Sequence, residues 1–335
     1  MSEQRILLGH GSGGGLSHEL IAGLFLRHFG NPVLSPLEDA SLVEVEGRIA
    51  FTTDSYVVKP IFFPGGDIGR LAICGTVNDL SMRGAKPLFL SAGFIIEEGL
   101  PVGDLERVVI SMSEAAQEAG VIIACGDTKV VEKGAADRLF INTAGIGAVP
   151  EGIDVSVQNG RPGDSVIVSG TVGDHGMTIL TQRQGLALRG SLSSDAAPLN
   201  GLVEAMLTAS PKLRALRDPT RGGLATTLNE IARSSNVGIE IEEAAVPISE
   251  GVQAACEMLG LDPLYLANEG KLVAVVPADD EGKVLAAMRQ HRYGVHAAVV
   301  GRITDDHPGR VVLKTPFGIR RVIDVLAADQ FPRIC

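Results

Sequence analysis

The chain has 335 residues, of which 45% are hydrophobic and 21% are charged, with 41 Gly and 17 Pro. This composition is typical of a globular protein of about two domains and excludes a disordered or fibrous chain. A formal net charge of -11 disfavours nucleic-acid binding, and no apolar run reaches the roughly 18 residues of a membrane-spanning helix. The first residues lack the basic and apolar regions of a secretory signal, so we expect a cytoplasmic protein.

Short β-rich segments alternate with helical patterns, which predicts an α/β or α+β fold. In the first half we expect one helix from about Asp67 to Arg83. A second helix is expected over residues 105–119, with Asp104 as its N-cap and Gly120 just past its end. The β-branched residues predict strands at Ile49–Thr53, Leu88–Ile96, 121–131 and 138–149.

A turn-rich stretch at residues 158–170 leads into a new buried strand and predicts a domain boundary near 155–160. We therefore expect an N-terminal domain over residues 1–157, a C-terminal domain over 158–328 and a mobile tail over 329–335. The predicted helices of the second half are Asp174–Gln184, Leu199–Thr208, Gly222–Ser234, Ser249–Leu259 and Asp279–Gln290. Its later strands are predicted near Ile239 and at Leu272–Val276, His296–Ile303 and Val311–Thr315.

A glycine-rich segment lies close to the beginning of the chain, with five glycines between Gly9 and Gly15. Gly9, Gly11 and Gly14 have the spacing of a dinucleotide-binding fingerprint, but no clean strand or well-placed acid accompanies them. The segment fits better as a flexible stretch that closes over a ligand. This makes Gly11 and Gly13 candidate nucleotide-binding residues.

Aspartates recur where predicted strands or helices stop. Each has a plain alternative, because Asp is a favoured N-cap and turn residue, and Asp67 suits that role. Asp79 is harder to explain in this way, since its helix is otherwise apolar and charged residues are rarely buried without a partner. Converging carboxylates are what magnesium and a polyphosphate require. The candidate metal ligands are Asp39, Asp54, Asp79, Asp127 and Asp218, and Thr53 and Asn78 are further nucleotide-binding candidates.

Lys129 lies two residues beyond Asp127 and should share its strand face. It could neutralise phosphate charge or transfer a proton, or it could be an edge-strand lysine that discourages aggregation. Asn268 and Glu269 precede a buried strand, where a simple turn competes with a catalytic acid or base. Structural roles are expected for the histidines that lack metal or triad spacing, which are His10, His18 and His175.

The cysteines are of two kinds. Cys74, Cys125 and Cys256 lie in apolar or small-residue settings, and we expect buried, inert thiols there. Cys335 is the last residue of the sequence. Because chain ends usually fray, its thiol would be open to oxidation unless something uses or shelters it.

Five stretches carry a resemblance to a known family: residues 50–95, 126–134, 217–232, 260–276 and 332–335. They closely resemble the HypE family of hydrogenase maturation proteins, within the aminoimidazole ribonucleotide synthetase-like superfamily, and the likeness runs over nearly the whole chain. The resemblance implies two α/β domains, with a mixed sheet and helices of the N-terminal domain forming a homodimer core. It also implies binding of magnesium-ATP in a groove between subunits or domains.

The same resemblance implies a chemistry for the last residue. In HypE-like proteins a HypF-type carbamoyltransferase carbamoylates the C-terminal cysteine, and ATP drives dehydration of that group to a thiocyanate. The nitrile then passes to iron held by HypC and HypD, as a cyanide ligand of [NiFe]-hydrogenase. Cys335 would then anchor the substrate, with Lys129, Asn268 and Glu269 around it and Glu269 or Lys129 as the base. The chain departs from the family at Glu38, where an aspartate often precedes the second acid.

A tail of residues 329–335 can span at most about 20 Å, which reaches from a domain surface into a cleft. We expect two tail states, since the thiol must leave the cleft to be charged and return to react. One alternative is a nonenzymatic thiol carrier, which would not need magnesium ligands. Another is selenophosphate synthetase, or a purine or thiamine pathway enzyme of the same superfamily. Selenophosphate synthetases use a reactive Cys and a Lys in the N-terminal glycine-rich loop, and Gly9–Gly15 contains neither.

Overall fold

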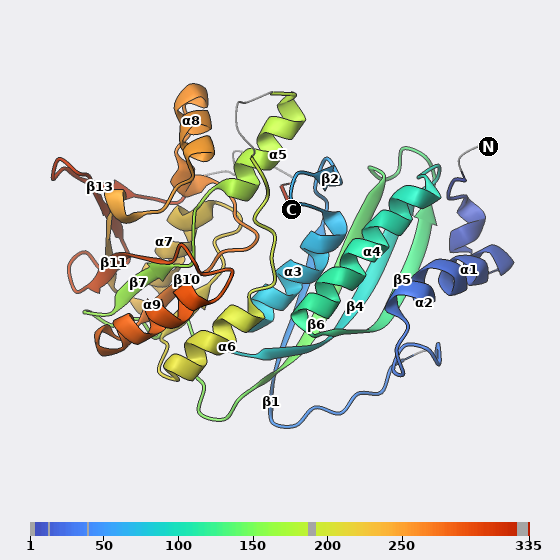
Figure 1. Ribbon diagram of the computed structural model, residues 1–335, viewed down its shortest axis with the longest axis horizontal. Coiled ribbons are helices and arrows are strands. Elements are labelled where there is room, and N and C mark those ends of the chain that lie inside the picture. The colour runs from blue at the N-terminus through green and yellow to red at the C-terminus, as the bar shows by residue number, and fades with distance from the viewer. Residues whose placement is uncertain (1–3, 13, 39, 187–191, 327–333) are drawn as a thin grey trace.

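The computed structural model describes residues 4–12, 14–38, 40–186, 192–326 and 334–335. Two mixed β-sheets lie next to each other, each with its own helices, and the N-terminal half of the chain builds one while the C-terminal half builds the other (Figure 1). The predicted α/β architecture with two sheet-containing halves is confirmed.

The N-terminal sheet has the strand order β1-β6-β4-β5. Its neighbours are antiparallel except β4 and β5, which are parallel. The strands are β1 (Arg48–Tyr56), β4 (Lys86–Glu97), β5 (Ile122–Val131) and β6 (Leu139–Val149), and a short hairpin is formed by β2 (Phe62–Phe63) and β3 (Gly66–Asp67). Helices α3 (Ile68–Ser81) and α4 (Val102–Ala119) cover one face of this sheet (Figure 1).

The ends of α3 and α4 follow from their capping residues. The carboxylate of Asp67 accepts hydrogen bonds from the backbone N–H groups of Gly69 and Arg70, at 2.8 and 2.9 Å, so its predicted cap role is confirmed. The prediction of Asp104 as the cap of α4 was wrong, because α4 starts at Val102 after Pro101. Pro101 is the N-cap, and its carbonyl accepts from the N–H groups of Asp104 and Leu105 at 3.1 and 3.2 Å, which leaves Asp104 inside the first turn.

A helical segment follows the glycine-rich stretch. After a 3-10 turn at Leu8–Gly11, the chain forms α1 (Gly15–Leu20), a π-helical turn at Ile21–Phe25 and α2 (Leu26–Phe29). The rings of Phe25 and Phe94 lie 4.8 Å apart, so this segment is packed on the sheet beside β5. The glycine-rich stretch is thus a turn that leads into a helix; Gly13 lies outside the described residues.

The C-terminal sheet has the strand order β13-β12-β9-β11-β7-β10-β8. Only β12 and β9 run parallel among these described pairs. The strands are β7 (Ser165–Val168), β8 (Ala215–Arg217), β9 (Gly238–Glu242), β10 (Val273–Val276), β11 (Ala298–Thr304), β12 (Val311–Lys314) and β13 (Arg320–Ile323). Strands β8 and β13 were not predicted, because each is very short and contains charged residues.

Helices cover both faces of the C-terminal sheet. One core places side chains of α7 against β7, β9 and β10, and another places α6 and α9 against the opposite face. The helices are α5 (Asp174–Gln184), α6 (Asn200–Ala209), α7 (Gly223–Ser235), α8 (Glu250–Leu259) and α9 (Glu281–Gln290). All five lie within two residues of their predicted bounds, which the flanking glycines and amphipathic stripes indicate well.

Residues 196–199, just before α6, form hydrogen bonds with α3 of the N-terminal half. The Asn78 side chain on α3 donates to the carbonyl of Ala197 and accepts from the N–H of Leu199, at 3.0 and 2.8 Å. Arg70 donates to the carbonyl of Ala196 at 2.8 Å. Because buried polar groups are costly when unpaired, these bonds fix the position of one half against the other.

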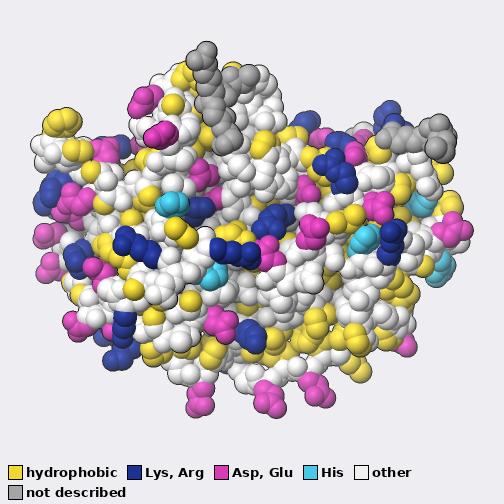
Figure 2. Space-filling view, viewed as in Figure 1, with side chains coloured by type: hydrophobic (Ala, Val, Ile, Leu, Met, Phe, Trp, Pro, Cys, Tyr) yellow, Lys and Arg dark blue, Asp and Glu magenta, His cyan; other side chains and the backbone are white. Residues whose placement is uncertain are grey.

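The face of the molecule shown in Figure 2 carries side chains of mixed character. On the face shown in Figure 2, basic, acidic and apolar side chains are interspersed, without the continuous basic surface that a nucleic-acid partner needs. No helix within the described ranges has both the length and the apolar character to cross a membrane.

Of the three cysteines expected to be buried, Cys74 and Cys256 are buried, but Cys125 is exposed because it lies on the edge strand β5.

Candidate active site

A cavity of about 240 Å³ lies where β1 and α3 of the N-terminal half meet loops of the C-terminal half. It collects acidic side chains, two arginines and a thiol in one place. Its lining residues are Thr53, Asp54, Gly75, Asp79, Arg217, Asp218, Thr220, Arg221, Glu269 and Cys335. Six residues predicted from the sequence therefore meet here: Thr53, Asp54, Asp79, Asp218, Glu269 and Cys335.

Asp54 and Asp79 come from adjacent elements of the N-terminal half. Asp54 lies near the end of β1, and Asp79 lies in the last turn of α3. The hydroxyl of Thr52 on β1 donates to the Asp79 carboxylate at 2.9 Å, which supplies part of the polar contact that an acid in this apolar helix requires. Burial nevertheless raises the pKa of Asp79, because it destabilises the charged carboxylate. A cation bound nearby would stabilise that charged form.

Asp218 and Glu269 come from loops of the C-terminal half and are buried. Burial, followed by the nearby Asp79, raises the pKa of Asp218 to about 7. Burial, followed by Asp218 and Asp195, raises the pKa of Glu269 well above its ordinary value. The Glu269 Oε1 atom has no hydrogen-bond partner among the described residues. These acids repel one another and favour either a proton or a cation in the cavity.

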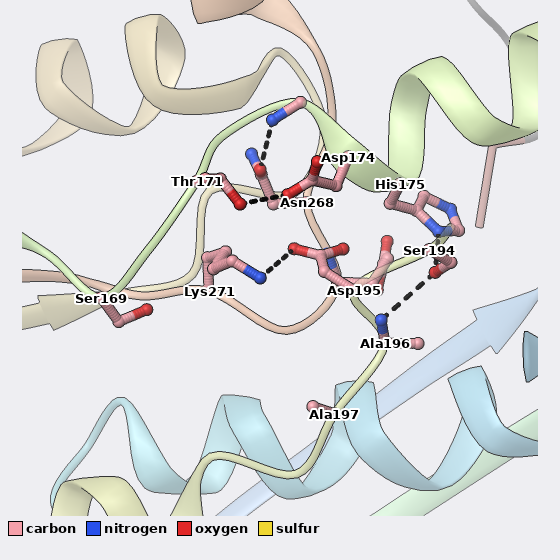
Figure 3. A network of polar contacts seen from close by, with 12 residues as sticks. Ser169, Thr171, Asp174, His175, Ser194, Asp195, Ala196, Ala197, Asn268 and Lys271 are labelled. Carbon is pink, nitrogen blue, oxygen red and sulfur yellow. Dashed lines mark hydrogen bonds and ion pairs between the residues drawn. The ribbon is translucent and has the colours of Figure 1, made fainter. Parts of the chain in front are cut away.

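Positive side chains border the same acids. Arg217 and Arg221 line the cavity, and Arg217 also pairs with Glu230 at 3.0 Å. The N–H of Glu269 donates to the buried Asp195 at 3.0 Å. Lys271 pairs with the same Asp195 carboxylate at 3.1 Å, as Figure 3 shows. The two cavity arginines present guanidinium groups that suit phosphate oxygens.

The acids do not form a complete metal cage. Among the residues that the structure describes, no three His, Cys, Asp or Glu side chains converge as a metal site would require. Magnesium rarely uses such a cage and usually binds one or two carboxylates, with phosphate and water completing its shell. The all-oxygen donor set, and the raised pKa values that a cation would relieve, fit magnesium bound together with a polyphosphate.

The last two residues of the chain lie inward. Ile334 is only 4% exposed and packs in the N-terminal core, while Cys335 lines the cavity. The N–H of Val57, just past β1, donates to the Cys335 carbonyl at 3.1 Å. The two described residues of the predicted tail thus carry the thiol to the acids.

Asp127, Lys129 and Gly11 lie elsewhere. They line a separate cavity of about 250 Å³ beside the N-terminal helices, and Lys129 pairs with Asp127 at 2.8 Å. This hydrogen bond lowers the pKa of Asp127. Because β1 and β5 form opposite edges of the sheet, these residues do not meet Cys335 within one chain.

The two asparagine candidates have structural partners. The Asn268 side chain accepts from the N–H of Gly173 at 2.7 Å and donates to the carbonyl of Pro219 at 2.9 Å. Asn78 donates to the carbonyl of Glu269 at 3.3 Å, in addition to its bonds across the two halves. Both amides hold the backbone around the acids. Thr53 donates to the carbonyl of Thr143 at 3.0 Å at the cavity wall.

Some relevant residues were missed from the sequence, and one prediction cannot be placed. Arg217 and Arg221 flank Asp218 in the stretch RDPTRGG, so their spacing could have indicated a phosphate-binding loop. Asp195 and Lys271 gave no signal, because they are distant in sequence. Asp39 lies outside the described residues.

The far face of the N-terminal sheet is apolar. Ile49, Phe51 and Ile95 are 51%, 70% and 45% exposed there, on the side away from α3 and α4. In the β4–β5 register Ile95 pairs with Lys129, so the side chains of Asp127 and Lys129 belong to this same face. Because exposed apolar patches are common at interaction sites, this face is a candidate for one.

Comparison with known proteins gives consistent matches over both halves. The N-terminal domain of AIR synthase related proteins matches residues 37–149, and the C-terminal domain of these proteins matches residues 161–314. The chain is 53% identical to the carbamoyl dehydratase HypE of Azotobacter vinelandii over 327 residues, which cover 97% of this chain and 96% of that protein.

Two solved structures are similar in both sequence and fold. A hydrogenase maturation protein HypE in complex with ATP matches with a TM-score of 0.96 and 52% identity, covering 98% of this chain and 99% of that one. A chain of a HypE-HypF complex matches with a TM-score of 0.82 and 53% identity, covering 92% of this chain and 99% of that one.

Proposed function

The chain belongs to the HypE family of carbamoyl dehydratases that mature hydrogenases, and we propose that it uses ATP to dehydrate a carbamoyl group carried on its own Cys335. The observation that carries this proposal is the position of Cys335, which lines one cavity with four carboxylates and two arginines. A thiol that only stores a group does not need this polar surrounding.

The reaction must replace a poor leaving group. An amide oxygen does not leave readily, so the carbamoyl oxygen first attacks the γ-phosphorus of ATP and ADP departs. Loss of one N–H proton gives a phosphorylated imidate attached to the cysteine sulfur. Loss of the second N–H proton and cleavage of the C–O bond then expel phosphate and leave S–C≡N on Cys335. In sum, S-carbamoylcysteine and ATP give S-cyanocysteine, ADP, phosphate and one proton.

Glu269 is the first candidate for the base that takes these protons. It is buried, it lines the same cavity as Cys335, and its Oε1 atom lacks a hydrogen-bond partner among the described residues. Burial raises its pKa, so its ionised form is a stronger base than that of an exposed glutamate. A cation held by the neighbouring acids would favour that ionised form.

Magnesium and the arginines would share the work of charge neutralisation. Asp54, Asp79 and Asp218 offer the oxygen ligands, and magnesium bound there would offset the charge of the phosphates. Arg217 and Arg221 would contact the phosphate oxygens. Asp39, predicted from the same family motifs, stays a further candidate ligand.

We propose that a second copy of the chain completes the site. The apolar face formed by Ile49, Phe51 and Ile95 suits the core of a homodimer interface. Asp127 and Lys129 lie at the edge of that face, so in a dimer they would reach the cavity of the partner instead of their own. The partner subunit's Lys129 would then be the second candidate for the base, and Gly11 and Gly13 would lie beside the same nucleotide.

We propose two protein partners. A HypE-HypF complex has been solved for a relative, and we propose a HypF-type carbamoyltransferase as the donor of the carbamoyl group to Cys335. We propose a HypC-HypD complex as the acceptor of the nitrile: two electrons supplied by a reductant in that complex would cleave the S–C bond, so that Cys335 regains its thiolate and cyanide binds the iron.

The test follows the mass of the C-terminal peptide in two steps. Incubation with the carbamoyltransferase, carbamoyl phosphate and ATP should add a carbamoyl group to Cys335. Later incubation with magnesium-ATP alone should remove one water from that peptide. A carbamoylated peptide that keeps its mass while ATP still binds would favour the carrier alternative. The variant Cys335→Ala is the matched control, and it should bind ATP and fold normally.

A further inference from the structure

His175 is a buried histidine that the proposed chemistry does not use. It lies in the first turn of α5 and is 0% exposed. Its Nδ1 atom is 2.8 Å from the Ser194 hydroxyl oxygen, and its Nε2 atom is 2.8 Å from the carbonyl oxygen of Ile334. One ring therefore connects the chain between α5 and α6 with the next-to-last residue.

The partners of the ring settle which nitrogen carries the proton. A carbonyl oxygen only accepts hydrogen bonds, so Nε2 must donate to Ile334. Burial lowers the pKa of His175, which favours the neutral ring, and Nδ1 then accepts the hydrogen of the Ser194 hydroxyl. The Ser194 oxygen in turn accepts from the N–H of Ala196 at 3.2 Å, a contact drawn in Figure 3. The three hydrogen bonds thus run in one order from donor to acceptor, from Ala196 through Ser194 and His175 to Ile334.

Both halves of the molecule hold the ring in place. The Phe63 ring packs edge-on against His175, with centroids 5.6 Å apart and planes at 83°. The N–H of Ser194 donates to the carbonyl of Pro64 at 2.8 Å. Gly65 has φ of +87° and lets this loop approach closely, since a Cβ there would lie 2.6 Å from the Ser194 carbonyl oxygen. The donor therefore has a fixed direction before the tail arrives.

We propose that His175 is the positioning residue that holds the tail inward and places Cys335 at the acids. Its bond to the Ile334 carbonyl and the bond from Val57 to the Cys335 carbonyl fix two consecutive residues. Together they set the register, because a slip of one residue would move the thiol by about 3.3 Å. Burial of the Ile334 side chain adds apolar contact.

The hydrogen bonds that hold Ile334 and Cys335 inward are weak enough to break reversibly. A typical hydrogen bond changes a folding or docking equilibrium by on the order of tenfold, not by many powers of ten. The tail can therefore leave to receive its carbamoyl group and return for dehydration. The consequence for dehydration depends on the proposed function, but the docking of the tail by His175 does not.

The first test measures how fast N-ethylmaleimide labels each cysteine, by peptide mass after proteolysis. His175→Phe keeps a ring against Phe63 but cannot bond to Ile334, and we expect Cys335 to be labelled roughly tenfold faster than in the native protein. Cys125, which is exposed, and Cys74 and Cys256, which are buried, serve as internal references whose rates should not change.

Two further variants separate the hydrogen bond to Ile334 from general packing. His175→Gln should restore slow labelling, because its amide can donate to Ile334 and accept from Ser194. Thr178→Val, on the same helix, loses only a buried bond to the Asp174 carbonyl and should label like the native protein. Unchanged labelling of Cys335 in His175→Phe would overturn the proposal. A matching rise at Cys74 and Cys256 would also overturn it, since this would indicate general loosening.

The second test compares the two chemical steps in His175→Phe. The outward state receives the carbamoyl group and the inward state reacts, so carbamoylation should be as fast as native or faster while dehydration slows roughly tenfold. ATP affinity should stay the same. Equal loss in both steps would contradict a positioning role. If the native protein failed to dehydrate at all, the proposed function would fall, while the labelling result would still decide the role of His175.

Discussion

The two edges of the N-terminal sheet differ in whether their charged residues lie in the cavity of Cys335 of the same chain. At the β1 edge, Asp54 and Asp79 meet acids of the C-terminal half and the thiol of Cys335 in one cavity. At the β5 edge, Asp127 and Lys129 are exposed and form an ion pair with each other. One chain therefore assembles Cys335 and these acids in one cavity, whereas Asp127 and Lys129 line a different cavity of the same chain.

The largest expected effect comes from the β1 edge. Glu269→Gln keeps the size of the side chain but removes the base, so we expect dehydration to slow by roughly 10²-fold or more, while carbamoylation of Cys335 is unchanged. Single-turnover assays of the carbamoylated protein measure the two steps separately. A loss below tenfold would show that another group takes the protons.

The next experiment asks whether the two edges act in one site across two chains. Asp79→Asn and Asp127→Asn should each be strongly impaired. In a mixture of the two after dissociation and reassembly, half of the dimers are hybrids, and each hybrid has one intact site. Activity should therefore recover to about a quarter of the native value. If mass measurement confirms the hybrids and activity still does not recover, then Asp79 and Asp127 do not act in one site across two chains.

These outcomes bear on what a sequence can predict. Asp54, Asp79, Asp218, Glu269 and Cys335 were predicted as part of a larger set that also held Asp127 and Lys129, and the structure brings these five into one cavity. The separation of Asp127 was not predictable from one sequence, since it depends on the order of strands in the sheet. Pairing between distant strands leaves no local pattern.

The same limit applies to His175 and to Asp104. The Ile334 partner of His175 is 159 residues away, so spacing along the chain could only indicate a structural residue. Asp104 has the side chain of an N-cap, but the helix starts earlier, with the carbonyl of Pro101 accepting the first hydrogen bonds. By contrast, α5 was predicted with its observed bounds, because glycines flank it on both sides.

A smaller effect should follow from charging the far face of the sheet. Phe51→Asp puts a carboxylate at the centre of the proposed homodimer interface, where burying an unpaired charge is costly. We expect a monomer in sedimentation at concentrations where the native protein is a dimer, and activity reduced by roughly tenfold. Leu42→Asp, at a 94% exposed loop position, is the matched control and should leave the dimer intact. A dimeric Phe51→Asp variant would exclude this face.

The smallest effect concerns pH. Burial and Asp79 raise the pKa of Asp218 to about 7, so below pH 7 this carboxyl holds a proton that a bound cation must displace. Affinity for magnesium-ATP should therefore fall by about tenfold between pH 8 and pH 6. Calorimetric titration across this range tests it, and Asp218→Asn should flatten the pH dependence. A native profile that is equally flat would exclude Asp218 from the metal site.

The most direct test of the account follows one oxygen atom. The carbamoyl group on Cys335 is prepared with ¹⁸O in its carbonyl position, and the protein is then given magnesium-ATP. Because phosphoryl transfer to that oxygen precedes its loss, we predict that the ¹⁸O appears in the released phosphate while Cys335 gains a thiocyanate. Release of the label as water, or ATP cleavage that leaves the labelled carbamoyl group on Cys335, would contradict the account.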